Sequence, residues 1–290
     1  MTERVLVTGA AGFLGSALTA TLRRGGVDVI ASSRNGGEGM IRSELSDAGD
    51  VRTLFTSQRF SSVIHCAATI SSEFSVTAEL VRNNILATTI LANEAKAAGV
   101  RNFVFCSSIE VYGGEGPYVE DSDRKPTNAY GWSKAAIEDS LSLIAALDFR
   151  VRVLRFSGLH GHGRSSGILH RLITAHMTDM PCSITEPESV FRLCAVDDAV
   201  DAIVRTSKHH VDDTYRVFNI GSAEILTLRE IACRVGAVLG AHARLFFPER
   251  APVRNRAFSI ERATTELGFI PRTMDTVIRS CMTTVGRNNE

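Results

Sequence analysis

The sequence predicts an α/β protein with a doubly wound parallel sheet and a smaller C-terminal region interleaved with it. Short apolar runs alternate with amphipathic helical stretches through the first half of the chain. This alternation requires crossover connections, which cover both faces of a parallel sheet with helices. A glycine-rich turn directly after the first apolar run supports the same fold class, because such turns lie at phosphate sites in parallel sheets.

Length and composition fit a globular protein without a nucleic-acid or membrane partner. The 290 residues can bury a large core, and 32 Lys and Arg balance 32 Asp and Glu, so no net field attracts polyanions. No apolar run reaches the length of a membrane span, and the N-terminus enters a strand rather than a signal sequence. The six cysteines form no CxxC pair. We therefore expect a cytoplasmic protein.

The periodicity places the elements in order along the chain. Strands are expected at residues 5–8, 27–31, 40–42, 63–68, 103–108, 151–156 and 218–221, and helices at 16–24, 47–58, 77–98, 130–147, 168–176 and 227–239. Parallel sheets bind ligands outside the carboxyl ends of their strands, so functional residues are expected just after strands.

Three glycines spaced three apart, Gly9, Gly12 and Gly15, stand between the first strand and the first helix. Glycine suits a sharp turn that a phosphate approaches closely, and the helix N-terminus attracts an anion. This position predicts a dinucleotide site; the alternative is a tight turn without a ligand. The expected contacts are Gly9, Ala11, Gly12, Phe13 and Leu14.

The end of the second strand indicates which dinucleotide binds. An acidic residue there selects NAD through the adenosine ribose, but this chain has Ser32, Ser33 and Arg34. A hydroxyl and a guanidinium suit the extra phosphate of NADP, so we expect Ser33 and Arg34 to favour NADP(H), with NAD(H) possible. The alternative is that Arg34 is a solvated surface residue.

Tyr130 and Lys134 lie four residues apart, on one face of a helix. A nearby cation favours the phenolate, so Lys134 is expected to lower the Tyr130 pKa from about 10 towards neutrality. Ser108, just past the fifth strand, is placed to hold a carbonyl oxygen beside that phenol. Trp132, in the same helix, is expected to pack internally.

The histidines do not predict a metal site. His160 and His162 lack a nearby third ligand and are expected to be loop residues. The pair His209 and His210 is expected in a solvated turn.

A series of motifs carries a family resemblance along nearly the whole chain. It comprises residues 8–15, 65–68, 84–88, 107–113, 126–130 with Lys134, 196–198, 218–222 and 267–271. With the GxxGxxG spacing, the chain resembles the extended short-chain dehydrogenase/reductases, the NAD-dependent epimerase/dehydratase family, whose cofactor domain is Rossmann-like.

The resemblance implies a role for each matching residue. Ser108, Tyr130 and Lys134 would be catalytic, and Lys134 would also hold the nicotinamide ribose. Glu44 and Leu45 stand where the family usually has Asp-Leu beside the adenine. The cofactor site would also include Cys66, Ala67 and Ala68, and a homodimer would form through the helices containing Asn84 and Tyr130.

We expect residues 1–157 to form the dinucleotide-binding domain, with a returning segment at 190–220. Residues 158–189 and 221–290 are expected to form the region that binds a small-molecule substrate. Within the family the motifs most resemble the NADP-dependent nucleotide-sugar 4-ketoreductases, such as the GDP-4-keto-6-deoxy-mannose reductases, which implies NADPH-dependent reduction of a ketosugar. Epimerase, dehydratase or decarboxylase activity with a retained NAD(P) is the alternative. A non-catalytic redox sensor is a third.

Several positions depart from the family pattern at the substrate end. Gly158 replaces an asparagine that contacts the substrate diphosphate, and histidines replace the usual Tyr-Gly-Pro-Gly sequence. Ile109 with Glu110 replaces the Asp-Glu pair of one dehydratase class, although Glu110 still matches the single glutamate of another and remains a candidate substrate contact. Arg192 and Arg254, together with Arg256, fall where the family often places substrate-binding arginines.

Overall fold

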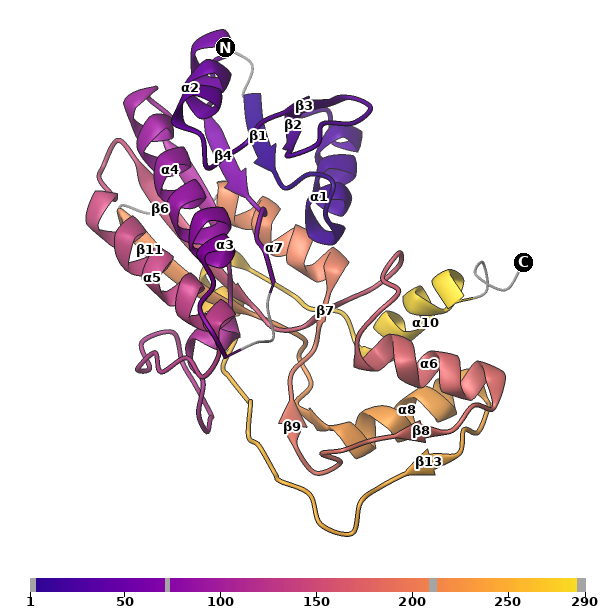
Figure 1. Ribbon diagram of the computed structural model, residues 1–290. Helices are drawn as coiled ribbons and strands as arrows, with labels where there is room; N and C mark the ends of the chain where they lie inside the picture. Colours follow the sequence, from indigo (N-terminus) through magenta and orange to yellow (C-terminus); the bar gives the residue numbers. More distant parts are fainter. Residues whose placement is uncertain (1–3, 71–73, 209–212, 286–290) are drawn as a thin grey trace. The chain divides into compact units, whose positions relative to one another are not determined.

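A computed structural model describes residues 4–70, 74–208 and 213–285. A seven-stranded sheet runs in the order β11-β6-β5-β4-β1-β2-β3 (Figure 1). The strands are β1 (Arg4–Thr8), β2 (Asp28–Ser33), β3 (Met40–Arg42), β4 (Ser62–His65), β5 (Asn102–Ser108), β6 (Arg150–Phe156) and β11 (Tyr215–Ile220). From β3 across to β6 every neighbouring pair is parallel. The predicted fold class is confirmed, and the strand order reverses between β1 and β4, where such sheets bind ligands.

Helices cover both faces of this sheet. Helix α1 (Phe13–Arg24) packs on β1 and β2, while α2 (Ala48–Ser57), α4 (Ala87–Ala97) and α5 (Ala129–Ile144) lie on the opposite face (Figure 1). Alternate strand residues, such as Leu6, Phe103 and Phe105, form a buried core with these three helices. Because successive side chains of a strand point to opposite faces, strands buried on both sides read as continuous apolar runs.

Contacts divide the chain into two units. The first contains Met1–Gly114, Asp121–Phe156 and Val200–Phe218, and the second contains Glu115–Glu120, Ser157–Ala199 and Asn219–Glu290. Short segments of the second unit pair as β7 (Leu159–His160) with β10 (Cys194–Ala195), β8 (Cys182–Ser183) with β13 (Leu245–Phe246), and β9 (Val190–Phe191) with β12 (Leu226–Thr227). Its core lies among α6 (Ile168–Thr178), α8 (Leu228–Leu239) and α10 (Met274–Val285).

The structure differs from the sequence-based expectations at several elements. The fourth strand ends at His65, so residues 66–68 lie beyond it. The expected helix at 77–98 consists of α3 (Ala78–Leu80), a π-helical turn η1 (Val81–Leu86) and α4. Helices α7 (Val196–Lys208), α9 (Glu261–Leu267) and α10 were not predicted. Trp132 is 42% exposed, so the expectation that it packs internally is wrong. His209 and His210 lie outside the described residues.

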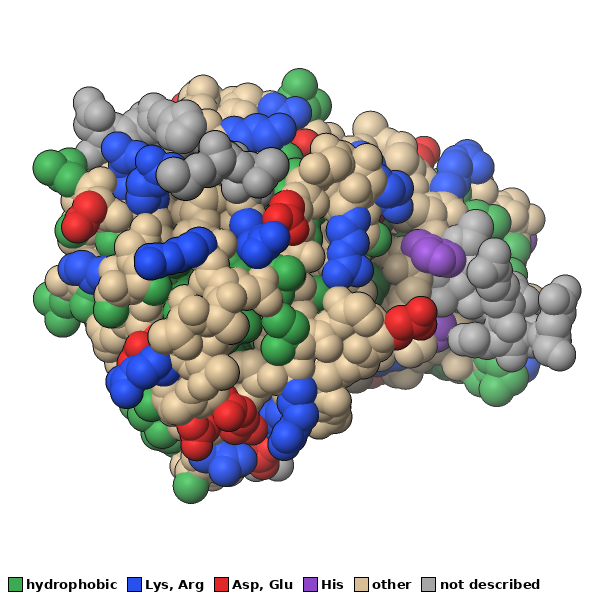
Figure 2. Space-filling model, turned by 90° about the horizontal axis from the view of Figure 1, so that it is seen from above, with side chains coloured by type: hydrophobic (Ala, Val, Ile, Leu, Met, Phe, Trp, Pro, Cys, Tyr) green, Lys and Arg blue, Asp and Glu red, His purple; other side chains and the backbone are tan. Residues whose placement is uncertain are grey.

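The surface carries dispersed charges. Lys and Arg side chains lie singly over the face in Figure 2, separated by uncharged and acidic groups. Within residues 4–70, 74–208 and 213–285, no helix combines the length and apolar character needed to cross a bilayer.

Candidate functional site

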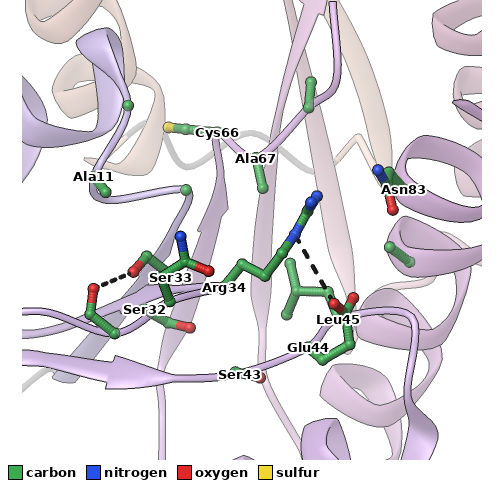
Figure 3. Close-up of a pocket in the computed structure, with 16 residues that line it drawn as sticks. Ala11, Ser32, Ser33, Arg34, Ser43, Glu44, Leu45, Cys66, Ala67 and Asn83 are labelled. Atoms are coloured by element: carbon green, nitrogen blue, oxygen red, sulfur yellow. Dashed lines mark hydrogen bonds and ion pairs between the residues drawn. The ribbon is translucent and has the colours of Figure 1, made fainter. Parts of the chain in front are cut away.

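A cavity of about 520 Å³ opens in the first unit at the carboxyl ends of β1, β2 and β4. This volume lies within the range of small-molecule sites. Figure 3 shows residues from the glycine-rich turn, the end of β2 and the segment after β4 converging on it. Its walls are Gly9, Ala11, Gly12, Ser32, Ser33, Arg34, Asn35, Gly36, Ser43, Glu44, Leu45, Cys66, Ala67, Ala68, Asn83 and Ala87.

The glycine-rich turn is packed so tightly that side chains are excluded. Gly9 has a φ of +69°, and a Cβ there would lie 2.5 Å from the backbone nitrogen of Ala67. At Gly15 a Cβ would lie 2.2 Å from the Gly9 carbonyl oxygen. Gly12 precedes α1 and offers no side-chain cap. The turn therefore packs against the segment after β4 and places the N-terminus of α1 at the cavity, as an anionic ligand requires.

The end of β2 carries an ion pair at the cavity wall. Arg34 Nε lies 3.9 Å from Glu44 Oε2, with the two side chains 55% and 31% exposed (Figure 3). Hydrogen bonds from Ser46, whose hydroxyl donates to Glu44 over 2.8 Å, lower the pKa of the Glu44 carboxyl. The Ser33 hydroxyl donates to the Gly36 carbonyl over 2.7 Å. Arg34 is therefore neither buried nor free in solvent: a carboxylate already faces it.

Most of the residues expected at the cofactor line this cavity. Phe13 and Leu14 do not, since they begin α1 and Leu14 is buried in the core. Tyr130 and Lys134 are also absent from its walls. The lining residues that sequence reasoning missed are Ser32, Asn35, Gly36, Ser43, Asn83 and Ala87.

Asn83 lines the cavity from the π-helical turn η1, and the adjacent Asn84 is buried. Asn84 Nδ2 donates to the Thr69 carbonyl over 2.9 Å and to Ser133 Oγ over 3.1 Å. Its Oδ1 accepts from the Thr69 amide at 2.7 Å. These bonds join η1 to α5 and to the segment after β4. Such π-helical turns are frequent at functional sites, but the periodicity of the sequence does not predict them.

Tyr130 and Lys134 lie one turn apart on α5. Lys134 Nζ lies 5.6 Å from the centroid of the Tyr130 ring and donates to the Cys106 carbonyl over 2.7 Å. Burial lowers the pKa of Lys134 to about 8 and raises the pKa of the Tyr130 phenol well above its usual value. The expectation that the Tyr130 pKa is lowered is therefore wrong for the protein alone, because burial, and after it Cys106 and Glu110, all disfavour the phenolate.

Ser108 stands at the end of β5 and is tied to the start of α5. Its Oγ accepts from the Glu110 amide at 3.2 Å. Asn128 caps α5 by accepting from the Gly131 amide at 2.7 Å and donates to Glu110 Oε2 over 2.7 Å. A Cβ on Gly131 would lie 2.3 Å from the Glu110 carbonyl oxygen. Glu110 thus links the two segments that carry Ser108 and Tyr130, a connection the sequence did not reveal.

His65 crosslinks the elements behind the cavity. Its Nδ1 lies 2.6 Å from Thr8 Oγ1, and its Nε2 lies 2.8 Å from Thr88 Oγ1. Thr88 donates its proton to the Asn84 carbonyl at 2.6 Å, so His65 must donate from Nε2 and accept at Nδ1. Burial lowers the pKa of His65 to about 3, so the ring is neutral at pH 7. The two ring hydrogen bonds of His65 join β1, β4 and α4, so its role is structural.

A buried charge cluster lies beneath Ser107 and Ser108. Glu138 is fully buried and accepts from Arg155 Nη2 at 2.6 Å and from Ser107 Oγ at 2.6 Å. Arg155 also donates to the Tyr112 hydroxyl over 2.7 Å, and Arg124 reaches Glu138 at 3.3 Å. Through the bond from Ser107 to Glu138, this cluster holds the end of β5 in place.

We expect Glu138→Gln to lower the free energy of unfolding by about 3–5 kcal/mol, because it leaves the buried Arg155 guanidinium without its counter-charge. The control is Glu94→Gln, which removes the partly exposed partner of the exposed Arg52, 2.9 Å away, and should cost far less, because solvent screens this pair. Urea unfolding followed by circular dichroism measures both. Equal losses in the two variants would contradict the assignment.

Three of the predicted substrate residues, Gly158, Arg192 and Arg254, lie in the second unit, whereas Glu110 lies in the first. The Gly158 carbonyl accepts from the Cys194 amide at 3.3 Å. Arg192 is buried, donates to the carbonyls of Ser222 and Ala223, and stacks 5.5 Å from the Phe258 ring. Arg254 is half exposed and lies 3.4 Å from Glu186. Each guanidinium already has a partner in the protein, and substrate contact by these residues stays a prediction.

One of the two histidines after β6, His160, lies in a strand and not in a loop. His160 is buried on β7, and burial lowers its pKa to about 4. The expectation that it is a loop residue is therefore wrong. Among the described residues, no group of three or more His, Cys, Asp or Glu is placed to hold a metal ion.

Comparisons with known proteins agree on the family. Residues 5–221 match the NAD dependent epimerase/dehydratase family. UDP-glucose 4-epimerase of Erwinia amylovora is 32% identical over 186 residues, so the match spans 55% of this chain and 55% of that protein. The dTDP-glucose 4,6-dehydratase of Streptomyces griseus is 31% identical, with 93% of this chain and 90% of that protein aligned.

A solved structure extends the likeness to the whole fold. MoeE5 in complex with UDP-glucuronic acid and NAD superposes with a TM-score of 0.85 at 30% sequence identity, covering 99% of this chain and 100% of that one. The family match at residues 5–221 includes the glycine-rich turn and nearly all of the seven-stranded sheet. The chain belongs to the NAD dependent epimerase/dehydratase family.

Proposed function

We propose that this protein is a nucleotide-sugar 4-epimerase that retains NAD(P) through each turnover. The relatives with printed activities are epimerases and 4,6-dehydratases, and MoeE5 binds UDP-glucuronic acid with NAD. This supports the alternative of a retained cofactor over net reduction. The paired acid of one dehydratase class is Ile109 here, which favours epimerisation over elimination.

The observation that carries the proposal is the short path from Lys134 to the cavity wall. Lys134 is bonded to the carbonyl of Cys106, and the Cys106 sulfur lies 3.5 Å from that of Cys66, which lines the cavity. The close packing around Gly9, the N-terminus of α1 without a side-chain cap and the volume of the cavity are all compatible with a bound dinucleotide. The catalytic helix thus adjoins the site that would hold the cofactor.

In this proposal Tyr130 takes the proton of a sugar hydroxyl while Ser108 donates a hydrogen bond to the same oxygen. Lys134 keeps much of its positive charge at neutral pH, because its pKa of about 8 lies above 7, and stabilises the phenolate. A dinucleotide bound in the cavity would supply a reversible hydride acceptor for the sugar carbon. Tyr130 then gives the proton back, so no external reductant is consumed.

The test is to incubate the purified chain with UDP-glucose, UDP-glucuronic acid and dTDP-glucose, and to follow products by NMR and the cofactor by its reduced-nicotinamide absorbance. We expect one substrate to give its 4-epimer without net change in that absorbance. Appearance of a 4-keto-6-deoxy product would establish a dehydratase instead.

A second candidate, net reduction of a 4-ketosugar by NADPH, is favoured by one observation: the end of β2 has no carboxylate and presents Ser33 and Arg34 to the cavity. Stoichiometric loss of NADPH in the presence of a ketosugar nucleotide would establish it.

For the cofactor itself we propose that NADP binds more tightly than NAD through Arg34. Arg34→Ala should weaken NADP binding about tenfold and leave NAD binding nearly unchanged. Only NADP carries a phosphate on its adenosine ribose, which is the group that the Arg34 guanidinium would bind. Glu44→Gln should raise the preference for NADP, since it removes the competing carboxylate 3.9 Å from Arg34. Titration of both dinucleotides by calorimetry measures the effects.

The control for the loss of a nearby positive charge is Arg42→Ala, on β3 but outside the cavity wall. It should change both affinities equally and slightly. Tighter binding of NAD than of NADP, unaffected by Arg34→Ala, would overturn the assignment.

We also propose a homodimer through η1, α4 and α5. These adjoining helices expose apolar side chains, with Val81 37%, Leu86 45% and Trp132 42% exposed. Light scattering should report twice the mass of the chain, and Trp132→Glu should shift it towards monomer, because a charge there must be desolvated on association. Ile270→Glu, at an exposed apolar residue of the second unit, is the control. A monomeric parent protein would refute the proposal.

A further inference from the structure

Two thiols face each other just beyond the end of β4, beside the last part of β5. The strands are paired so that His65 lies beside Phe105, which brings the next residues, Cys66 and Cys106, opposite each other. Their sulfur atoms are 3.5 Å apart. Cys106 is buried, while Cys66 is only partly buried and lines the cavity (Figure 3). A reagent that enters the cavity therefore reaches Cys66 first.

The backbone of Cys66 packs against the glycine-rich turn, and the backbone of Cys106 accepts a hydrogen bond from Lys134. A Cβ on Gly9 would lie 2.8 Å from the carbonyl carbon of Cys66, so the glycine-rich turn rests directly on Cys66. The carbonyl of Cys106 accepts the Lys134 ammonium at 2.7 Å. A displacement of these two residues would move the turn and the lysine together.

We propose that Cys66 and Cys106 are a redox modification site, which a peroxide closes to a reversible disulfide that weakens dinucleotide binding. The effect on binding rests on the proposed dinucleotide site, whereas formation of the bond does not. Within residues 4–70, 74–208 and 213–285 every cysteine is free, so both thiols are available.

The chemistry uses one peroxide for each disulfide. The Cys66 thiolate attacks a peroxide oxygen, the O–O bond breaks, and a sulfenic acid forms with release of hydroxide or the alcohol. The Cys106 sulfur then attacks the Cys66 sulfur, the S–S bond forms, and water leaves. Two thiols are oxidised, and the peroxide is reduced to two molecules of water or to water and an alcohol.

The backbone permits this bond after a small movement. Neighbouring strands lie about 4.8 Å apart, within the span of about 4.4–6.8 Å that disulfides bridge between Cα atoms. The sulfurs must approach from 3.5 Å to about 2.05 Å. Cys66 lies beyond the last residue of β4. Its displacement perturbs the 3.1 Å hydrogen bond from its amide to the Thr8 carbonyl and shifts the segment under Gly9.

The reduced pair is expected to react slowly. The hydrogen bond with Cys106 and burial both raise the pKa of the Cys66 thiol, and Lys134 offsets this only in part. A smaller thiolate fraction slows attack on the peroxide. The exposed thiol of Cys233 is therefore expected to react first, and the experiment is done in a Cys233→Ser background.

The test treats the full-length Cys233→Ser protein with hydrogen peroxide, blocks remaining thiols, and maps tryptic peptides. Cys66 lies in peptide 60–82 and Cys106 in peptide 102–124. We expect these peptides to be crosslinked, with the loss of two hydrogens in mass. We also expect dinucleotide binding to weaken about tenfold and to recover after dithiothreitol. Saturating NADP or NAD should slow the reaction, because the ligand covers Cys66.

The additional variant Cys106→Ala should give no crosslinked peptide, and any change in binding that remains in it is due to the Cys66 sulfenic acid and not to the disulfide. Should it fold poorly, reversal by dithiothreitol in the Cys233→Ser protein provides the same comparison. Over-oxidation of Cys66 without the crosslinked peptide would overturn the proposal, as would a crosslinked protein with unchanged affinity. A reduced protein that binds neither dinucleotide would instead refute the proposed function, because the crosslink is read independently.

Discussion

Replacing Tyr130 by phenylalanine is expected to lower kcat by about 10²- to 10⁴-fold, the range that a positioned proton donor and acceptor contributes. The variant loses one oxygen atom and keeps its ring against Lys134, whose ammonium lies 5.6 Å from the ring centroid. Dinucleotide affinity should change little, because Tyr130 does not line the cavity. The measurement is turnover of the nucleotide sugar identified by the NMR screen, with dinucleotide affinity from calorimetry.

The control removes a phenol oxygen elsewhere in the same unit. Tyr215→Phe breaks only a 3.3 Å bond to the Glu138 carbonyl and should retain nearly full activity. A Tyr130→Phe protein that turns over within a few-fold of the parent would refute the proton-transfer role. The same result would revive the interpretation of the chain as a dinucleotide-binding sensor.

Gly9→Ala is expected to abolish dinucleotide binding and to lower the free energy of unfolding by about 2–5 kcal/mol. Two costs add: an L-residue with a φ of +69° is strained by about 1–2 kcal/mol, and a Cβ 2.5 Å from the Ala67 nitrogen forces the backbones apart at about 1–3 kcal/mol. Since Ala67 also lines the cavity, the same movement deforms the site.

Gly26→Ala separates the two costs. Gly26 has a φ of +76°, but nothing lies within 4 Å of a Cβ placed there. The Gly26→Ala variant should lose only the part of the free energy of unfolding that comes from the positive φ, about 1–2 kcal/mol. It should bind dinucleotide as the parent protein does. Urea unfolding and calorimetric titration test both variants. Equal destabilisation would show that crowding at the turn is unimportant.

The sheet was predictable because its strands are short continuous apolar runs and its helices are longer amphipathic stretches, so length and periodicity together distinguished them. The glycine-rich turn was predictable because Gly9 and Gly15 fill positions where a side chain would overlap the backbone. The second unit was less predictable. Several of its strands are only two residues long, such as β7 and β10, and two residues carry no readable period.

The polar contacts of the site were beyond sequence reasoning for a different reason. The Asn128–Glu110 bond joins residues 18 apart in the chain, and the Arg34–Glu44 pair joins a strand end to a later loop. Such pairs depend on how the elements pack. The Tyr130 pKa was misjudged for the same reason, since the spacing to Lys134 is local while the desolvation comes from the whole fold.

The contact between Gly131 and the Glu110 carbonyl has a consequence for rate. With Asn128 bonded to both segments, the end of β5 and the first turn of α5 move as one body. The entropy of orienting Ser108 relative to Tyr130 is then lost during folding and not during each encounter with substrate. In the proposed mechanism Gly131 would thus preorganise the two side chains, and a larger residue at position 131 would transfer that entropic cost to the reaction barrier.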